Sequence, residues 1–161
     1  LQDYDTNYKV SPPLRSAADV AAIKEGLADG TLDAIACDHA PHGRTDKEVE
    51  FEYAANGITG LETSLGLSLA LVQDGILTWP QLIAKMSCNP ARILNLPKGT
   101  LAKDADADIT VIDPDCEWTV DVKSFVSRGK NSPFNGRSLK GKAVLTIVGG
   151  DIKYGGLASK S

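Results

Sequence analysis

Two residue types suited to chemistry, Asp38 and His42, stand four positions apart directly after a short apolar run at residues 32–37. That run, broken only by Asp33, is typical of a buried strand, and Pro41 stiffens the following turn by fixing its own φ. Barrel enzymes place acids of this kind at the carboxyl ends of buried parallel strands. Asp38 is therefore the first candidate for catalysis and His42 the second, although such an acid can also act only as a helix cap.

The composition is that of an ordinary globular protein, with 161 residues, 42% of them hydrophobic and 24% charged. The net charge of -4 argues against nucleic acid or an anionic membrane as partner, and no apolar run approaches the roughly 20 residues of a membrane span. Three cysteines without C-x-x-C spacing predict reduced thiols in a cytoplasmic protein. Because the chain lacks an initial Met and holds only two histidines, we expect a fragment that cannot complete a histidine-rich metal site.

The first part of the chain alternates helix and strand signals, as βαβ units do. Ser16 with Asp19 predicts a capped helix start, and Gly30 predicts the end of that helix just before the candidate strand. The charged residues 43–53 predict a solvated loop or a short exposed helix. Further helices are predicted over residues 61–75, 78–86 and 89–94.

After about residue 96 the pattern changes to short β segments. Strands are predicted at residues 109–112, 118–120, 143–148 and 152–154, with a hairpin turn at Gly149-Gly150. Asp104, Asp106 and Asp108 alternate as calcium ligands can, but the glycine and downstream glutamate of an EF-hand loop are absent. We therefore expect a turn there.

Two loops are candidates for binding. The stiff stretch at residues 9–15 contains Pro12-Pro13, and stiff loops hold a ligand at low entropic cost. The stretch at residues 56–60 has two glycines three apart, which permit close backbone approach. The first stretch could also be a plain connector, and the second a turn followed by a helix start.

Five motifs, in this order along the chain, resemble the carboxyl-terminal part of the bacterial type I dihydroorotases of the cyclic amidohydrolase group. They are KVSPPLR at 9–15, DHAPH at 38–42, GITGLET at 57–63, ADITVID at 107–113 and GKNSPF at 129–134. The resemblance implies an α/β fold: the C-terminal portion of a (β/α)8 metal-dependent-hydrolase barrel in residues 1–95, followed by part of a small β-sandwich in residues 96–161. It implies reversible interconversion of N-carbamoyl-L-aspartate and (S)-dihydroorotate in de novo pyrimidine (UMP) biosynthesis.

The same resemblance implies the roles of individual residues. Asp38 would be a ligand of a zinc site that holds one or two ions, and it would also act as general acid/base. His42 would bind the substrate carboxylate, and Asn56 and Gly57 would contact the substrate, Gly57 through its backbone N–H. Ser11 falls at a substrate contact where many relatives carry Asn or Arg. The remaining zinc ligands would precede this chain, so we expect the 161 residues alone to be inactive.

Alternatives remain open. The chain could belong to an allantoinase or a dihydropyrimidinase-like hydrolase, which share the fold and metals but open another ring. It could also belong to a non-catalytic dihydroorotase-like subunit that scaffolds a transcarbamoylase. The resemblance implies a small-molecule substrate, a homo-oligomer and, as a further partner, aspartate transcarbamoylase.

Overall fold

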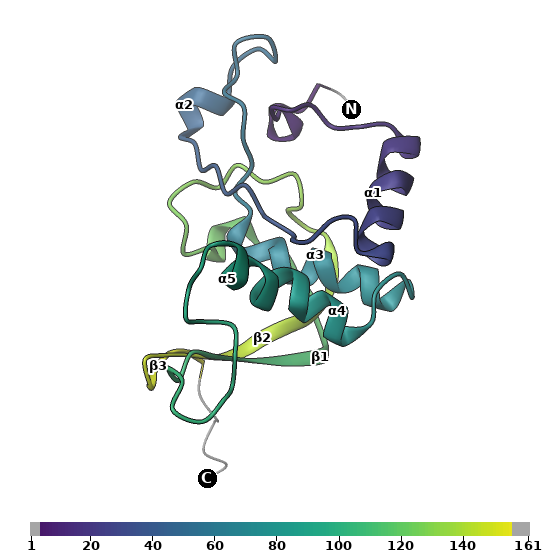
Figure 1. Ribbon diagram of the computed structural model, residues 1–161. Coiled ribbons are helices and arrows are strands. Elements are labelled where there is room, and N and C mark those ends of the chain that lie inside the picture. Colours follow the sequence, from purple (N-terminus) through teal and green to yellow (C-terminus); the bar gives the residue numbers. More distant parts are fainter. Residues whose placement is uncertain (1–3, 156–161) are drawn as a thin grey trace.

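The computed structural model describes residues 4–155. Most of the helical segments precede a small sheet along the chain (Figure 1). The helical segments are η1 (Thr6–Tyr8), α1 (Ala17–Asp29), α2 (Arg44–Lys47), α3 (Leu61–Gln73), α4 (Trp79–Ile83), the π-helical turn η2 (Ala84–Cys88), α5 (Asn89–Ile93) and η3 (Val122–Ser124). The strands are β1 (Ile109–Thr119), β2 (Ser138–Val148) and β3 (Asp151–Gly155). No helix in the described range is long and apolar enough to cross a membrane.

Local capping sets the helix boundaries. The Ser16 side chain accepts a hydrogen bond from the Asp19 amide, and the Asp19 carboxylate accepts one from Ser16 in return. Gly30 closes α1 in the left-handed conformation with φ 91°. Thr78 and Gln81 form the same reciprocal box at the start of α4. The predicted starts of both helices and the predicted end of α1 at Gly30 are confirmed, whereas α4 ends at Ile83 and the predicted helix continues as the π-helical turn η2.

The predicted strand at residues 32–37 is not part of any sheet in the described chain. The segment has no regular secondary structure, because a strand ladder needs neighbouring strands. Just after it, a single parallel bridge joins His39 to Ile58. Its backbone bonds to η2 instead, because the Ile35 amide donates to the Lys85 carbonyl at 3.0 Å. The buried Lys85 ammonium in turn donates to the Leu32 carbonyl.

The sheet is antiparallel throughout, in the order β1-β2-β3. The strands predicted at residues 109–112 and 118–120 lie on one long strand, β1, whose pairing with β2 is interrupted between Asp113 and Glu117. Pro114 lies in that interruption, where its missing N–H costs no ladder bond. The hairpin predicted at Gly149-Gly150 joins β2 to β3, as expected.

Helix α3 is the element that connects the two parts, because it packs against both β2 and α4 (Figure 1). One buried cluster joins α1, α3 and α4, and a second joins the end of β1 to β2. The first consists of Leu27, Leu69, Leu77 and Leu82, and the second of Val120, Phe125 and Leu139. Among the apolar side chains of α1, Leu27 is buried, whereas Ile23 is 52% exposed.

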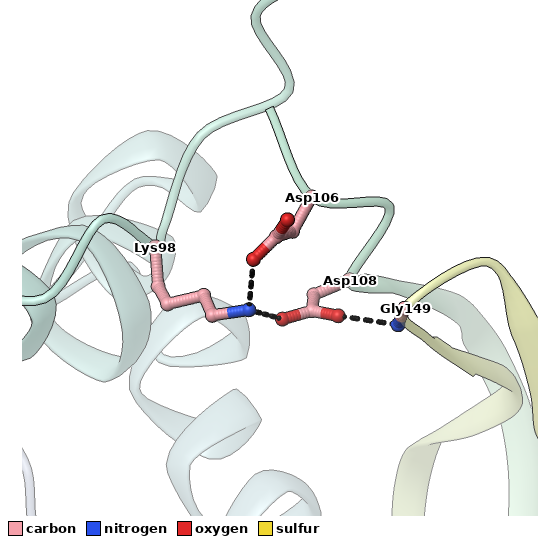
Figure 2. A network of polar contacts seen from close by, with 4 residues as sticks. All are labelled: Lys98, Asp106, Asp108 and Gly149. Carbon is pink, nitrogen blue, oxygen red and sulfur yellow. Dashed lines mark hydrogen bonds and ion pairs between the residues drawn. The ribbon is translucent and has the colours of Figure 1, made fainter. Parts of the chain in front are cut away.

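The stretch that carries Asp106 and Asp108 is held by an exposed lysine. The Lys98 ammonium lies 2.6 Å from a carboxylate oxygen of each aspartate. The other oxygen of Asp108 accepts the Gly149 amide at 2.7 Å, which ties this stretch to the β2–β3 hairpin (Figure 2). The pair of acids thus serves a structural contact.

Candidate functional site

A cavity of about 530 Å³ lies between the proline-rich loop, the extended segment before His39, the 56–60 turn and the start of α3. Ser11, Asp38, Asn56 and Gly57 all line it, together with polar side chains of α3 such as Thr63 and Ser64. These four predicted residues, of which Ser11 and Gly57 are 46 positions apart in the sequence, therefore meet at one cavity. The fifth predicted residue, His42, contacts the lining turn but is not part of the lining.

Asp38 has an unusual backbone conformation, with φ at +44°. Asp tolerates this left-handed region better than most residues, and such outliers cluster at functional sites. Two contacts hold the chain on either side of it. Gly60 sits so close that a Cβ there would lie 2.8 Å from the Cys37 carbonyl, and the Ala40 amide donates to the Ile58 carbonyl at 2.9 Å. The result is an exposed carboxylate presented at the cavity wall.

His39 points its ring at the start of α3. Its Nδ1 accepts the amides of Gly60 and Leu61 at 3.1 and 3.3 Å, so the ring proton is assigned to Nε2. Nearby, Glu62 accepts the Ser127 amide at 2.8 Å through Oε1, while Oε2 is buried without a partner among the described residues. Burial raises the pKa of Glu62, but the bonds from Ser127 and the nearby His39 outweigh it and leave the pKa below 4.5. His39 thus fixes the start of α3 beside the cavity, and Glu62 connects α3 to Ser127.

His42 is fixed by two bonds. Its Nε2 lies 2.9 Å from the Asn56 carbonyl, and because a carbonyl can only accept, Nε2 carries the proton. Its backbone amide donates to Oδ1 of Asn131 at 2.9 Å. The ring nitrogen that faces the 56–60 turn is thus already engaged.

Gly57 is a position that only glycine fits. Its φ is +147°, and a Cβ would lie 2.6 Å from the Ala40 Cβ and 2.9 Å from the Ala40 carbonyl oxygen. Its N–H donates to the Lys9 carbonyl at 2.9 Å. The predicted substrate contact through this N–H would therefore require that bond to open.

Lys47 was missed by the sequence analysis, which expected a solvated stretch. Its side chain is only 3% exposed, and its ammonium donates to the carbonyls of Ala55 at 2.8 Å and Gly57 at 3.2 Å. A longer contact of 3.5 Å reaches the Lys9 carbonyl. Burial lowers the pKa of Lys47, the charge of Lys9 lowers it further, and Asp5 opposes the change. Nothing in the charged run around it distinguishes this lysine from its exposed neighbours.

Asn131 was also missed, although it lies in one of the motifs quoted above. It is 5% exposed and accepts both the His42 amide and the Thr59 hydroxyl on Oδ1. Its Nδ2 donates to the carbonyls of Ala40 and Gly57, each at 3.0 Å. One side chain therefore joins the 38–42 segment to the 56–60 turn.

The zinc site expected from the resemblance is not complete within residues 4–155. No group of three His, Cys, Asp or Glu side chains that could hold a metal ion occurs in this part of the chain. Zinc sites use three or four protein ligands, and Asp38 supplies a single carboxylate. The donor set described here does not by itself fit a zinc ion.

Known proteins resemble this chain closely but extend well beyond it. A dihydroorotase of Syntrophus aciditrophicus is 64% identical over 154 residues, and one of Geobacter metallireducens is 58% identical over the same length. The match covers 96% of this chain and 36% of each relative. The resemblance to dihydroorotases stated above is confirmed.

A solved structure has a similar fold. The L-hydantoinase (dihydropyrimidinase) from Arthrobacter aurescens superposes with a TM-score of 0.87 at 37% identity, over 95% of this chain and 36% of its own. The described part is thus a partial α/β fold of the kind found in that larger enzyme. Residues 8–153 match the amidohydrolase family, and the chain therefore belongs to that family.

Proposed function

We propose that this chain is the carboxyl-terminal part of a dihydroorotase, which interconverts N-carbamoyl-L-aspartate and (S)-dihydroorotate. One observation carries the proposal: Ser11, Asp38, Asn56 and Gly57, chosen from the sequence, line a single cavity. The 64% identity to a protein named dihydroorotase supports the choice of substrate. Pyrimidine biosynthesis would be the pathway served.

The proposal includes an architecture. Residues 1–95 would supply the last strands and helices of a (β/α)8 barrel, and residues 96–161 part of a β-sandwich. The chain spans 36% of the length of its dihydroorotase relatives, which leaves room for the remainder of both. The other ligands of a zinc site would come from that remainder. A cytoplasmic homo-oligomer, with aspartate transcarbamoylase as a further partner, is part of the same proposal.

Asp38 would carry the proton in this reaction. When the dihydroorotate ring opens, water adds to the ring carbonyl carbon and the C–N bond breaks. A carboxylate at the cavity wall can accept the proton of that water and return it to the leaving ring nitrogen. The position of Asp38 suits this role, because the residue lines the cavity and is exposed, so that its carboxylate is accessible to a bound substrate. No step is assigned to a metal, because the donor set described above does not fit one.

The substrate carboxylate would be bound beside the 56–60 turn. The Asn56 side chain lines the cavity and can donate through its amide nitrogen. His42 would contribute when its Nε2 releases the Asn56 carbonyl and donates to the substrate instead. In the structure, the bond between His42 and Asn56 links the imidazole to the turn that lines the cavity.

A second candidate has specific support. The structural similarity to a hydantoinase, at 37% identity, favours a hydrolase of a related cyclic ureide. The deciding experiment compares kcat/KM of the full-length protein for dihydroorotate, hydantoin and allantoin. We expect a preference for dihydroorotate on the order of 10²-fold, since a site built for a carboxylate rejects rings that lack it. A preference for hydantoin or allantoin would overturn the proposal in favour of this second candidate.

The isolated chain offers a separate test. Because it supplies one candidate metal ligand, we expect no turnover of dihydroorotate by the 161 residues alone at any zinc concentration. Titration of zinc during an activity assay measures this. Turnover by the isolated chain would mean that the proposed division of the site is wrong.

A further inference from the structure

We propose that Asn131 is a positioning residue, which sets the geometry of His42 and of the Gly57 turn relative to each other. Of the tests given below, only the kinetic one rests on the proposed function. Asn131 touches neither the cavity nor a reacting atom. It acts through the two segments that it joins.

The hydrogen bonds of Asn131 use both ends of its side-chain amide. Oδ1 accepts the His42 amide at 2.9 Å, and Nδ2 donates to the Gly57 carbonyl at 3.0 Å. A third bond reaches the Ala40 carbonyl, and the Thr59 hydroxyl donates to Oδ1 at 2.8 Å. The Asn131 backbone carbonyl also accepts the Thr59 amide at 2.9 Å. Each of these groups belongs either to the 38–42 segment or to the 56–60 turn.

The residue reaches this place from far along the chain. It lies 89 positions after His42, in the loop between η3 and β2. Close backbone contact holds that loop in place, because a Cβ at Gly129 would lie 2.6 Å from the Cβ of Pro41. The strand-rich part of the chain thus supplies a support for the cavity that lies in the helical part.

Only an amide side chain meets these demands at this size. The site needs two N–H donors and an acceptor at one carboxamide, and Asp offers no donor when it is charged. Because Asn131 and Thr59 are 5% and 0% exposed, water cannot replace a lost bond without rearrangement. We call this set of Asn131 hydrogen bonds the clamp. Loss of one of its bonds should shift His42 and the Gly57 turn relative to each other and therefore change substrate binding.

The test uses Thr59→Val, which keeps the side-chain shape but removes the hydroxyl that donates to Asn131. In the full-length enzyme we expect the KM for dihydroorotate to rise about three- to tenfold, with kcat nearly unchanged. The reason is that the lost hydrogen bond helps to position groups that bind the substrate equally in the ground state and the transition state. Thr59→Ser keeps the hydroxyl and should retain the wild-type KM. Asn135→Ala is the matched control, since Asn135 lies in the same loop and its side chain accepts the Val122 amide at 3.1 Å, outside the 38–42 segment and the 56–60 turn.

Several results would overturn the inference. They are an unchanged KM in Thr59→Val, an equal rise in Asn135→Ala, or a parallel fall of kcat and folded fraction that a merely structural role would produce. If the wild-type protein hydrolyses no dihydroorotate, the proposed function fails by itself. In that case hydrogen exchange of the His42 amide decides: at least about tenfold faster exchange in Thr59→Val supports the clamp, and unchanged exchange refutes it.

Discussion

Two polar networks in this molecule invite comparison: the buried one around Asn131 and Lys47, and the exposed one around Lys98. The Lys98 contacts are the shorter, at 2.6 Å to each aspartate (Figure 2). The hydrogen bonds that Lys98 donates to the two aspartates raise the pKa of Lys98, and the pKa of Asp108 is lowered mainly by its bond from Lys98. The buried bonds are longer, from 2.8 to 3.2 Å for the two closer contacts of Lys47.

The comparison shows that distance is a poor guide to the importance of a polar contact. The Lys98 side chain is 40% exposed, so water and salt compete for its partners. Lys47 and Asn131 are 3% and 5% exposed, and a group left unpaired there has nothing to replace its partner. The substitutions below probe this difference, from the largest expected effect to the smallest.

Among the substitutions that test stability, Gly57→Ala should lower the free energy of unfolding the most. The added methyl group would meet the Ala40 backbone at 2.9 Å in a conformation that only glycine adopts freely. We expect the free energy of unfolding to fall by about 2–4 kcal/mol. Chemical denaturation of the full-length protein measures this.

The control for that substitution is Gly136→Ala. Gly136 also has a positive φ, of +79°, but nothing lies within 4 Å of the added Cβ. Its cost should be only that of backbone strain, about 1–2 kcal/mol. Equal losses in the two variants would mean that the close approach of the turn to Ala40 has no energetic weight.

Lys47→Met removes the donor that the carbonyls of Ala55 and Gly57 share. We expect a loss of about 1–3 kcal/mol in the free energy of unfolding, because the Ala55 carbonyl is left without this partner. Lys123→Met, at an exposed lysine, should change it by no more than about 0.5 kcal/mol. If both variants are equally stable, the buried network contributes nothing through Lys47.

Glu62 predicts a pH dependence of stability. Its pKa is lower in the folded chain than the ordinary 4.5, so its contribution is present above that pH and is lost as the pH falls through the folded value. Glu62→Gln should therefore cost stability at pH 7 and progressively less toward about pH 3. Urea midpoints of both proteins at the two pH values measure this. A difference that does not change with pH would contradict the assignment.

Lys98→Ala should have the smallest effect, despite its two short contacts. Exposed ion pairs lose most of their energy to solvent and salt. We expect a slight fall in the unfolding midpoint at low salt that disappears at about 1 M salt, where the screening length is about 3 Å. A loss as large as that of Lys47→Met would reverse the ranking of the two networks.

How much the sequence could predict depends on the range of the interactions. The cap at Ser16 and the box at Thr78 involve neighbours three residues apart, so the helix starts were predictable. The strand predicted at residues 32–37 forms no strand ladder in the described chain, because pairing depends on partners elsewhere. Asn131 was missed for the same reason, because its partners lie 72 to 91 positions away. Lys47 was missed because nothing in the charged run around it distinguishes it from its exposed neighbours.

The residues that line the candidate site were easier to predict from the sequence than the residues that hold them in place. Ser11, Asp38, Asn56 and Gly57 were chosen from residue type and motif, and they line one cavity. What could not be foreseen is which of their hydrogen-bonding groups are already engaged. The N–H of Gly57 and the Nε2 of His42 both bond to backbone carbonyls, which only coordinates reveal.

The most direct test of the account is the rate of dihydroorotate hydrolysis by the full-length enzyme carrying Asp38→Asn. We expect kcat to fall by about 10²–10⁴-fold, the usual contribution of a general acid/base, without a change in the unfolding midpoint. Asp46→Asn, which alters an exposed carboxylate that accepts the Gly43 amide, should keep wild-type activity. If Asp38→Asn is as active as Asp46→Asn, Asp38 is not the proton carrier and the proposed site is wrong.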